Sequence, residues 1–73
     1  MFELEFGKRI RKLRLYRNLT QQKVADYLHI TRSAYSYYES GKTEPNLKTL
    51  LRLSKLYGVS TDLLLTGKRR KKP

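Results

Sequence analysis

The sequence predicts an all-α fold, a compact bundle of five helices in which the second and third form a helix-turn-helix. The first supporting observation is a set of residues whose side-chain oxygens can cap helix N-termini: Thr20, Thr31, Asn46 and Ser60. The second is a set of glycines placed where helices must end: Gly41, Gly58 and Gly67. The third is that no apolar–polar alternation typical of β-strands appears in the chain.

The first helix is predicted over about residues 6–16. Its inward-facing residues are Ile10 and Leu13, with Phe6 and Arg17 close to the same stripe. The rest of its surface is basic and carries Lys8, Arg9, Arg11 and Lys12. This helix therefore presents one apolar face to a core and a positively charged face elsewhere.

The second helix is predicted over about residues 21–28 and the third over about residues 32–40. Their inward-facing residues are Val24, Ala25 and Leu28 on the second helix and Tyr35 and Tyr38 on the third. Between the caps of these two helices there is room only for a turn, which is the spacing of a helix-turn-helix. In a basic chain this spacing indicates the DNA major groove as the binding target.

A loop over residues 42–45 follows the third helix, because Pro45 cannot continue a helix. The fourth helix is predicted over about residues 47–57. A short fifth helix begins after Ser60 and ends near Leu65.

The length of the chain allows one domain only, which we expect to cover residues 1–66. A basic flexible tail without apolar residues, residues 67–73, completes the chain, and we expect it to be disordered when free. One interpretation gives this tail non-specific phosphate or minor-groove contacts. The other makes it a solubilising tail or a remnant of cloning.

The composition narrows the class of function. A net charge of +11 predicts a polyanion as the partner. The absence of cysteine excludes disulfides. Because the chain also has a single histidine, we expect no metal site and no cofactor. No membrane-length apolar run or signal peptide is visible, so we expect a cytoplasmic protein with no membrane partner. The sequence also shows no combination of residues typical of a catalytic site, so we do not expect the protein to be an enzyme.

Two charged residues fall on stripes that should be buried. Arg14 follows Ile10 by four residues, and Glu39 follows Tyr35 by four. An unpaired buried charge is costly, so each of the two needs a partner. One interpretation is a partly buried ion pair that joins the first and third helices. The other is that both side chains lie at the rim of the core and point to water.

A combination of residues spread over about residues 6–66 is typical of one family. The matching residues are Ile10, Leu13, Arg14, Leu19, Thr20, Gln21, Val24, Ala25, Leu28, Ile30, Thr31, Tyr38, Glu39, Ser40, Gly41, Pro45, Leu50, Leu53, Val59, Ser60, Asp62, Leu63 and Leu64. The chain resembles the phage-repressor, Cro-like helix-turn-helix family, also called the xenobiotic-response-element type. The resemblance implies a lambda-repressor-like bundle, sequence-specific DNA binding by a transcriptional regulator, and an ion pair between Arg14 and Glu39. The family usually has glycine in the turn where this chain has His29, which can adopt a positive φ at some cost.

The exposed positions of the third helix are the predicted base contacts: Arg32, Ser33, Ser36 and Tyr37. They match the family's base-contacting positions, and the helix should enter the major groove with its N-terminus first. Arg32 can form a bidentate pair with guanine worth roughly 1–3 kcal/mol of discrimination, whereas the two serines specify weakly. Tyr37 either reaches a thymine methyl group or a phosphate, or packs its ring along the protein surface.

A second group of residues is predicted to contact phosphates. The N-terminus of the second helix favours an anion, and Gln21 is the side chain placed there. The family commonly uses this glutamine, and Lys42 matches another of its phosphate contacts. The remaining candidates are the caps Thr20 and Thr31 and the flanking charges Arg17 and Lys23. Each basic residue taken alone is more often simply solvated, so the prediction depends on their sharing a face with the third helix.

The favoured hypothesis is a homodimeric repressor that binds double-stranded DNA. The apolar residues Leu56, Leu63 and Leu65 exceed what one small core needs, and they either form a two-fold dimer patch or complete the monomer core. The alternative is an antitoxin-type interaction protein that binds a partner protein as well as its own operator. In that case the leucines and the basic tail meet the partner.

Overall fold

The computed structural model describes residues 5–68. This part of the chain contains α1 (Glu5–Tyr16), α2 (Gln21–Leu28), α3 (Arg32–Ser40), α4 (Leu47–Tyr57) and α5 (Thr61–Thr66). The all-α prediction is confirmed, and each predicted helix agrees with the observed bounds to within one residue at either end. Residues 69–73 of the predicted tail lie outside the described residues, so the role of the tail stays a prediction.

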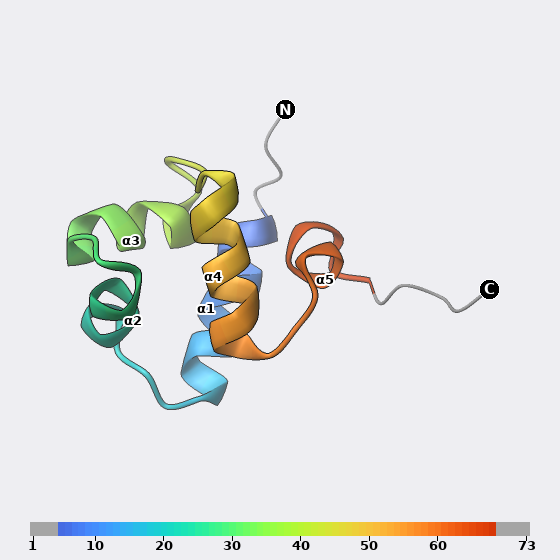
Figure 1. The fold of residues 1–73 in the computed structure, drawn as a ribbon, viewed down its shortest axis with the longest axis horizontal. Coiled ribbons are helices and arrows are strands. Elements are labelled where there is room, and N and C mark those ends of the chain that lie inside the picture. Colours follow the sequence, from blue (N-terminus) through green and yellow to red (C-terminus); the bar gives the residue numbers. More distant parts are fainter. Residues whose placement is uncertain (1–4, 69–73) are drawn as a thin grey trace.

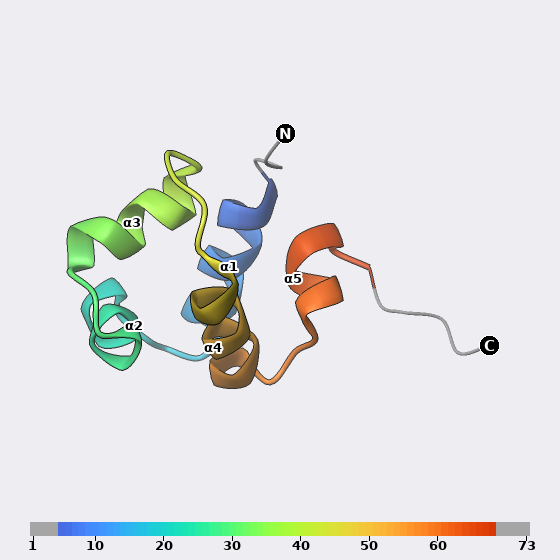
Figure 2. The same cartoon turned by 45° about the horizontal axis from the view of Figure 1, so that its top comes forward.

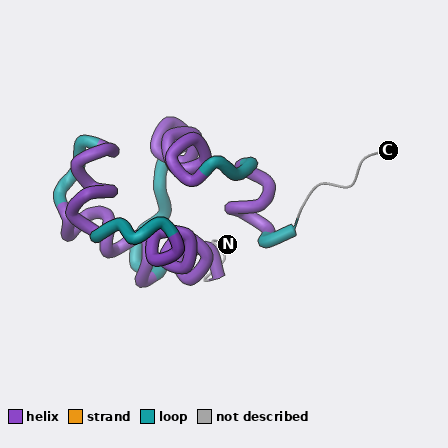
Figure 3. Tube along the Cα trace, turned by 90° about the horizontal axis from the view of Figure 1, so that it is seen from below, coloured by secondary structure: helices purple, strands orange, loops and turns teal. Residues whose placement is uncertain are grey.

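The helices are arranged around α1 and α4. Figure 1 shows α2 and α3 at one end of the long axis and α5 at the other, with α1 and α4 between them. Figure 2 keeps this order after a turn of 45°, and Figure 3 shows helices and loops alone in the described part. Helix α1 packs against both α3 and α5, so it connects the two ends of the bundle.

The ends of the helices follow from local side-chain chemistry. All four predicted caps accept a hydrogen bond from the backbone N–H three residues later: Thr20, Thr31, Asn46 and Ser60. The three predicted glycine stops all have positive φ. His29 also adopts the left-handed conformation, with a φ of 59°, and its N–H donates to the Asp26 carbonyl at 3.2 Å. A residue with a Cβ therefore occupies the turn between α2 and α3, at the conformational cost expected from the sequence.

The core takes residues from all five helices. Its buried apolar members are Phe6, Ile10, Val24, Ala25, Leu28, Tyr35, Leu50, Leu53, Tyr57 and Leu64. Leu56 packs partly buried against this cluster, so for Leu56 the structure favours the monomer core over a dimer patch. Leu63 is half-buried, and Leu65 is exposed on the surface of α5.

Two arginines bind the carbonyl ends of other helices. Arg9 donates from Nε to the Leu64 carbonyl at 2.9 Å and from Nη2 to the Leu65 carbonyl at 3.1 Å. Arg17 donates from Nη2 to the Tyr57 carbonyl at 3.0 Å. The last carbonyls of a helix lack intrahelical partners and carry partial negative charge, so these contacts stabilise α5 and α4. Arg17 is also one of the predicted phosphate contacts, and that role stays a prediction beside the contact with Tyr57.

Helix α1 approaches the end of α3 closely at Gly7, which is buried. A Cβ at this position would overlap the Glu39 carbonyl oxygen and lie 2.8 Å from the Tyr38 carbonyl oxygen. Arg14 lies two turns further along α1, on the same face as Gly7. The missing side chain therefore lets α1 approach α3 and brings Arg14 opposite Glu39.

Candidate nucleic-acid interface

The outward face of α3 carries the residues that were predicted to contact bases. Arg32, Ser33 and Tyr37 are exposed, and Ser36 is half-buried, while Tyr35 on the opposite face is fully buried. The Ser36 hydroxyl donates to the Ser33 carbonyl at 2.9 Å, which leaves its oxygen free to accept. The structure therefore brings the four predicted residues together on one accessible surface at the end of the bundle.

An ion pair fixes α3 against α1. Arg14 donates from Nε to Glu39 Oε2 at 2.6 Å and from Nη2 to Glu39 Oε1 at 3.1 Å. The two side chains are 10% and 5% exposed, which rules out a position at the rim. Arg14 also donates from Nη1 to the Leu19 carbonyl at 3.0 Å, so it holds the α1–α2 connection just before α2 begins as well. The predicted Arg14–Glu39 pair is confirmed, and its geometry is the bidentate one that gives orientation as well as energy.

Gln21 extends this ion pair to the surface. Its side-chain Nε2 donates to Glu39 Oε1 at 3.1 Å, and its Oε1 accepts from Arg32 Nη1 at 3.3 Å. Sequence reasoning placed Gln21 only at a phosphate. It missed this bridge because α2 must be packed against α3 before Gln21 becomes a neighbour of both Arg32 and Glu39. The bridge connects the buried carboxylate to Arg32 at the tip of α3.

Two tyrosine hydroxyls complete the buried part of this network. The hydroxyl oxygens of Tyr35 and Tyr57 are 3.1 Å apart and share a hydrogen bond, and a hydrogen bond from Tyr35 helps to lower the pKa of Glu39. Sequence reasoning assigned Tyr35 only to the packed stripe of α3. Its hydroxyl has a second task, which is to satisfy the carboxylate from the core side.

The charges in the network are stable near neutral pH. Burial raises the pKa of Glu39, but hydrogen bonds from Arg14, Tyr35 and Gln21 outweigh burial and hold this pKa below its usual value. The hydrogen bond to Glu39 raises the pKa of Arg14. Burial raises the pKa of both Tyr35 and Tyr57, so both hydroxyls keep the protons that they donate.

The predicted phosphate contacts are not all equally available. Thr20 and Thr31 are exposed, and their hydroxyls accept the capping hydrogen bonds. Lys23 is exposed on α2. The Lys42 ammonium lies 4.9 Å from the centre of the Tyr37 ring, a cation–π contact. This contact favours the second interpretation of Tyr37, in which the ring packs along the protein surface.

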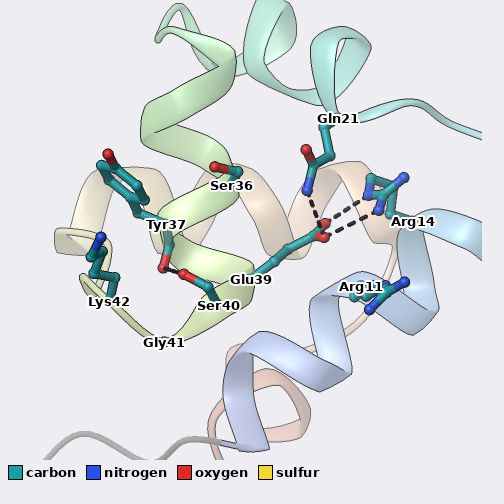
Figure 4. A pocket seen from close by; sticks show the side chains of 9 residues that line it. All are labelled: Arg11, Arg14, Gln21, Ser36, Tyr37, Glu39, Ser40, Gly41 and Lys42. Carbon is teal, nitrogen blue, oxygen red and sulfur yellow. Dashed lines mark hydrogen bonds and ion pairs between the residues drawn. The ribbon is translucent and has the colours of Figure 1, made fainter.

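A cavity of about 760 Å³ opens beside the second half of α3. Figure 4 shows the residues that line it: Arg11, Arg14, Gln21, Ser36, Tyr37, Glu39, Ser40, Gly41 and Lys42. They come from α1, from the start of α2, and from α3 with the two residues that follow it. The Arg14–Glu39 pair lies between Gln21 and Arg11 in this view. Sequence reasoning did not select Arg11, because nothing in the pattern distinguishes it from the other basic residues of α1.

The described residues contain neither a metal-ligand cluster nor a membrane-spanning helix. Among residues 5–68, no three histidine, cysteine, aspartate or glutamate side chains gather in a way that could hold a metal ion. In the same part of the chain, no helix is long and apolar enough to cross a membrane.

Curated relatives of the chain are transcriptional regulators. The chain is 55% identical over 62 residues to the SPbeta prophage-derived uncharacterized HTH-type transcriptional regulator YonR of Bacillus subtilis (strain 168), covering 85% of this chain and 57% of that protein. It is 42% identical over 64 residues to the HTH-type transcriptional activator BcrR of Enterococcus faecalis, covering 88% of this chain and 31% of that protein. The chain thus spans about half or less of the length of these relatives.

A solved structure and a family model give the same classification. The P22 c2 repressor, in a crystal structure with the synthetic operator 9T, aligns with a TM-score of 0.82 and 36% identity, covering 86% of this chain and 96% of that one. The model of the helix-turn-helix family matches residues 10–64, which include the four predicted base contacts and both members of the buried ion pair. The chain therefore belongs to the helix-turn-helix family.

Proposed function

We propose that this protein is a sequence-specific transcriptional regulator that binds double-stranded DNA with α3 in the major groove. The observation that carries the proposal is the outward face of α3, which is held in position from behind by Glu39, Arg14 and Gln21. A DNA-recognition helix must present its side chains in a fixed orientation, and this network fixes the orientation of α3. The similarity to the P22 c2 repressor, whose structure was determined with a synthetic operator, supports the same assignment.

In the proposed complex with DNA, some residues contact bases and others contact phosphates. Arg32 pairs with guanine, and Ser33 and Ser36 contact neighbouring bases more weakly. The phosphate contacts come from the start of α2, with Thr20, Gln21 and Lys23, and from Lys42 beyond α3. Thr31, at the N-cap of α3, belongs to the same group.

The regulator acts as a homodimeric repressor on this proposal. Two copies must place their α3 helices one DNA turn apart, about 34 Å, so the site is an inverted repeat with half-sites about 10 bp apart. Large apolar side chains exposed on α4 and α5 are available for a two-fold contact. They are Leu47 and Leu51 on α4, 84% and 51% exposed, and Leu65 on α5, 41% exposed.

The experiment is a selection of bound sequences from random DNA, followed by titrations of the selected site and of scrambled DNA over a series of salt concentrations. We expect an inverted repeat, and a gap in affinity of roughly 10³-fold or more at physiological salt. Arg32→Ala should relax the preference at one or two base pairs, at a cost of about 1–3 kcal/mol, while Lys42→Ala should weaken all sequences about equally. Coincident curves for the two DNAs at every salt concentration would leave only a polyanion binder.

A further inference from the structure

The cavity beside α3 carries an excess of positive charge that the fold does not use. Three cationic side chains and one carboxylate line it: Arg11, Arg14, Lys42 and Glu39. Arg14 is occupied by Glu39, so the pair contributes little net charge. Within residues 5–68, neither Arg11 nor Lys42 has an ion pair, and the Lys42 ammonium lies over the face of the Tyr37 ring. Two cations thus remain available on a concave surface.

The position of these two cations suits an extended anion. Figure 4 shows Lys42 and Arg11 on opposite sides of the cavity, with the end of α3 between them. The lining also includes the polar side chains of Ser36, Ser40 and Gln21. Ser36 also belongs to the outward face of α3, so the cavity is continuous with the surface that we propose enters the major groove. A DNA strand that borders this groove carries phosphates spaced along a line, which matches cations on two sides better than a single small anion does.

We propose that this cavity receives the DNA backbone beside the groove, and that Arg11 is a phosphate-contacting residue on α1. This inference rests on the proposed function and adds to it a helix that no sequence argument placed at the DNA. The guanidinium of Arg11 is exposed, and a charge-assisted hydrogen bond to a phosphate oxygen is the interaction that its geometry favours. The carboxylate of Glu39 does not repel the phosphate strongly, because Arg14, Gln21 and Tyr35 all donate to it.

The chain offers a matched control in the next residue. Lys12 is exposed on α1 and does not line the cavity. Arg11→Gln and Lys12→Gln each remove one positive charge from adjacent positions, so they change the net charge equally. The affinity of both variants is measured on the selected site and on scrambled DNA, over the same salt series as the wild-type protein.

We expect Arg11→Gln to weaken binding about tenfold near 0.15 M salt on both DNAs, and to reduce the steepness of log K against log salt by about 0.9 for each subunit bound. Lys12→Gln should stay within about twofold of the wild-type protein and keep its slope. The preferred sequence should not change in either variant, because phosphate contacts do not specify bases. Arg11→Lys, which keeps the charge, should retain the wild-type slope.

Equal losses for Arg11→Gln and Lys12→Gln overturn the inference, as does a reduced slope for Arg11→Lys. If the proposed function fails instead, the wild-type protein itself does not distinguish the selected site from scrambled DNA. The two variants are compared on both DNAs, so the result decides on Arg11 in either case. Thermal unfolding of each variant shows that the fold is intact, and Arg11→Ala, which also removes the charge, takes the place of Arg11→Gln if that variant does not fold.

Discussion

Glu39 joins the core of the molecule to its proposed binding face. It accepts two hydrogen bonds from Arg14 and one from Gln21, and Tyr35 donates to it from the core side. A carboxylate has room for about four such donors, so its capacity is used. A charge in this position is tolerated because its hydrogen-bond partners offset the cost of burying it.

The first prediction concerns this pair. Glu39→Ala or Arg14→Ala should each lower the free energy of unfolding by roughly 3–5 kcal/mol, because the surviving charge stays buried without its partner. The double variant should lose less than the sum of the two single variants. Urea unfolding of the three variants and the wild-type protein gives the coupling energy. Additive losses would mean that the two side chains do not interact in solution.

The second prediction concerns Tyr37 and Lys42. The ring lies under the Lys42 ammonium, so we expect Tyr37 to position this cation rather than to read a base. Tyr37→Phe keeps the ring and should bind DNA like the wild-type protein. Tyr37→Leu removes a contact of about 0.5–1 kcal/mol and should weaken binding a few-fold on every sequence. In a Lys42→Ala background, the same change should have no further effect. An altered selected sequence in any Tyr37 variant would instead assign this residue to a base.

At the scale of the helices, the contact between α1 and α3 depends on Gly7, which has no Cβ. Gly7 is buried, and the backbone carbonyls of Tyr38 and Glu39 occupy the space that a Cβ needs. Alanine is normally favoured over glycine inside a helix by roughly 1 kcal/mol. Here the neighbours are backbone atoms near the end of α3, which cannot move aside without shifting that helix.

The third prediction follows from this contact. Gly7→Ala should destabilise the protein by about 1–3 kcal/mol despite the gain in helix propensity, because α1 and α3 must separate. The same variant should weaken DNA binding more than its effect on folding explains, since Arg14 and Glu39 are drawn apart. Thermal unfolding and a titration of the selected DNA site measure the two effects. Lys12→Ala serves as the control, because Lys12 is exposed on the same helix. A stability equal to or above that of the wild-type protein would contradict the close approach.

At the scale of the whole molecule, several basic residues of the described part of the chain fall into two groups with different roles. Arg9, Arg14 and Arg17 bind carbonyl or carboxylate groups of the fold and hold helices together. The exposed cations Arg11 and Lys42 contribute to the positive field that attracts a polyanion. The net charge of +11 therefore does not measure the charge that is available to DNA.

The fourth prediction concerns the pH dependence of stability. The pKa of Glu39 is below 4.5 in the folded protein, so the unfolded chain binds more protons between the two pKa values and stability rises with pH there. The contribution of Glu39 is therefore fully present above about pH 4.5 and is lost as the pH falls through the folded pKa. The difference in stability between the wild-type protein and Glu39→Gln should shrink on acidification. Urea unfolding of both proteins at about pH 7 and about pH 3 measures it. A difference that does not change with pH would show that Glu39 keeps its ordinary pKa.

The helix bounds and the exposed face of α3 were predictable from the printed residues alone. A cap such as Thr31 bonds an N–H three residues away, and a helical stripe repeats within a few residues, so these features depend on local chemistry. The pattern of residues alone left the pairing of Arg14 with Glu39 open between a buried pair and two rim charges, the family resemblance implied the pair, and the packing showed it. Its members are 25 residues apart, and the pattern reports only that both positions face inward.

Packing alone settled the contacts that join distant segments. The bridge from Arg32 through Gln21 to Glu39, the binding of Arg17 to the end of α4, and the close approach at Gly7 all bring together residues from different helices. A long polar side chain has several partners within reach of its backbone position. The one it takes depends on the relative placement of whole helices, which the apolar core determines and no short stretch of sequence encodes.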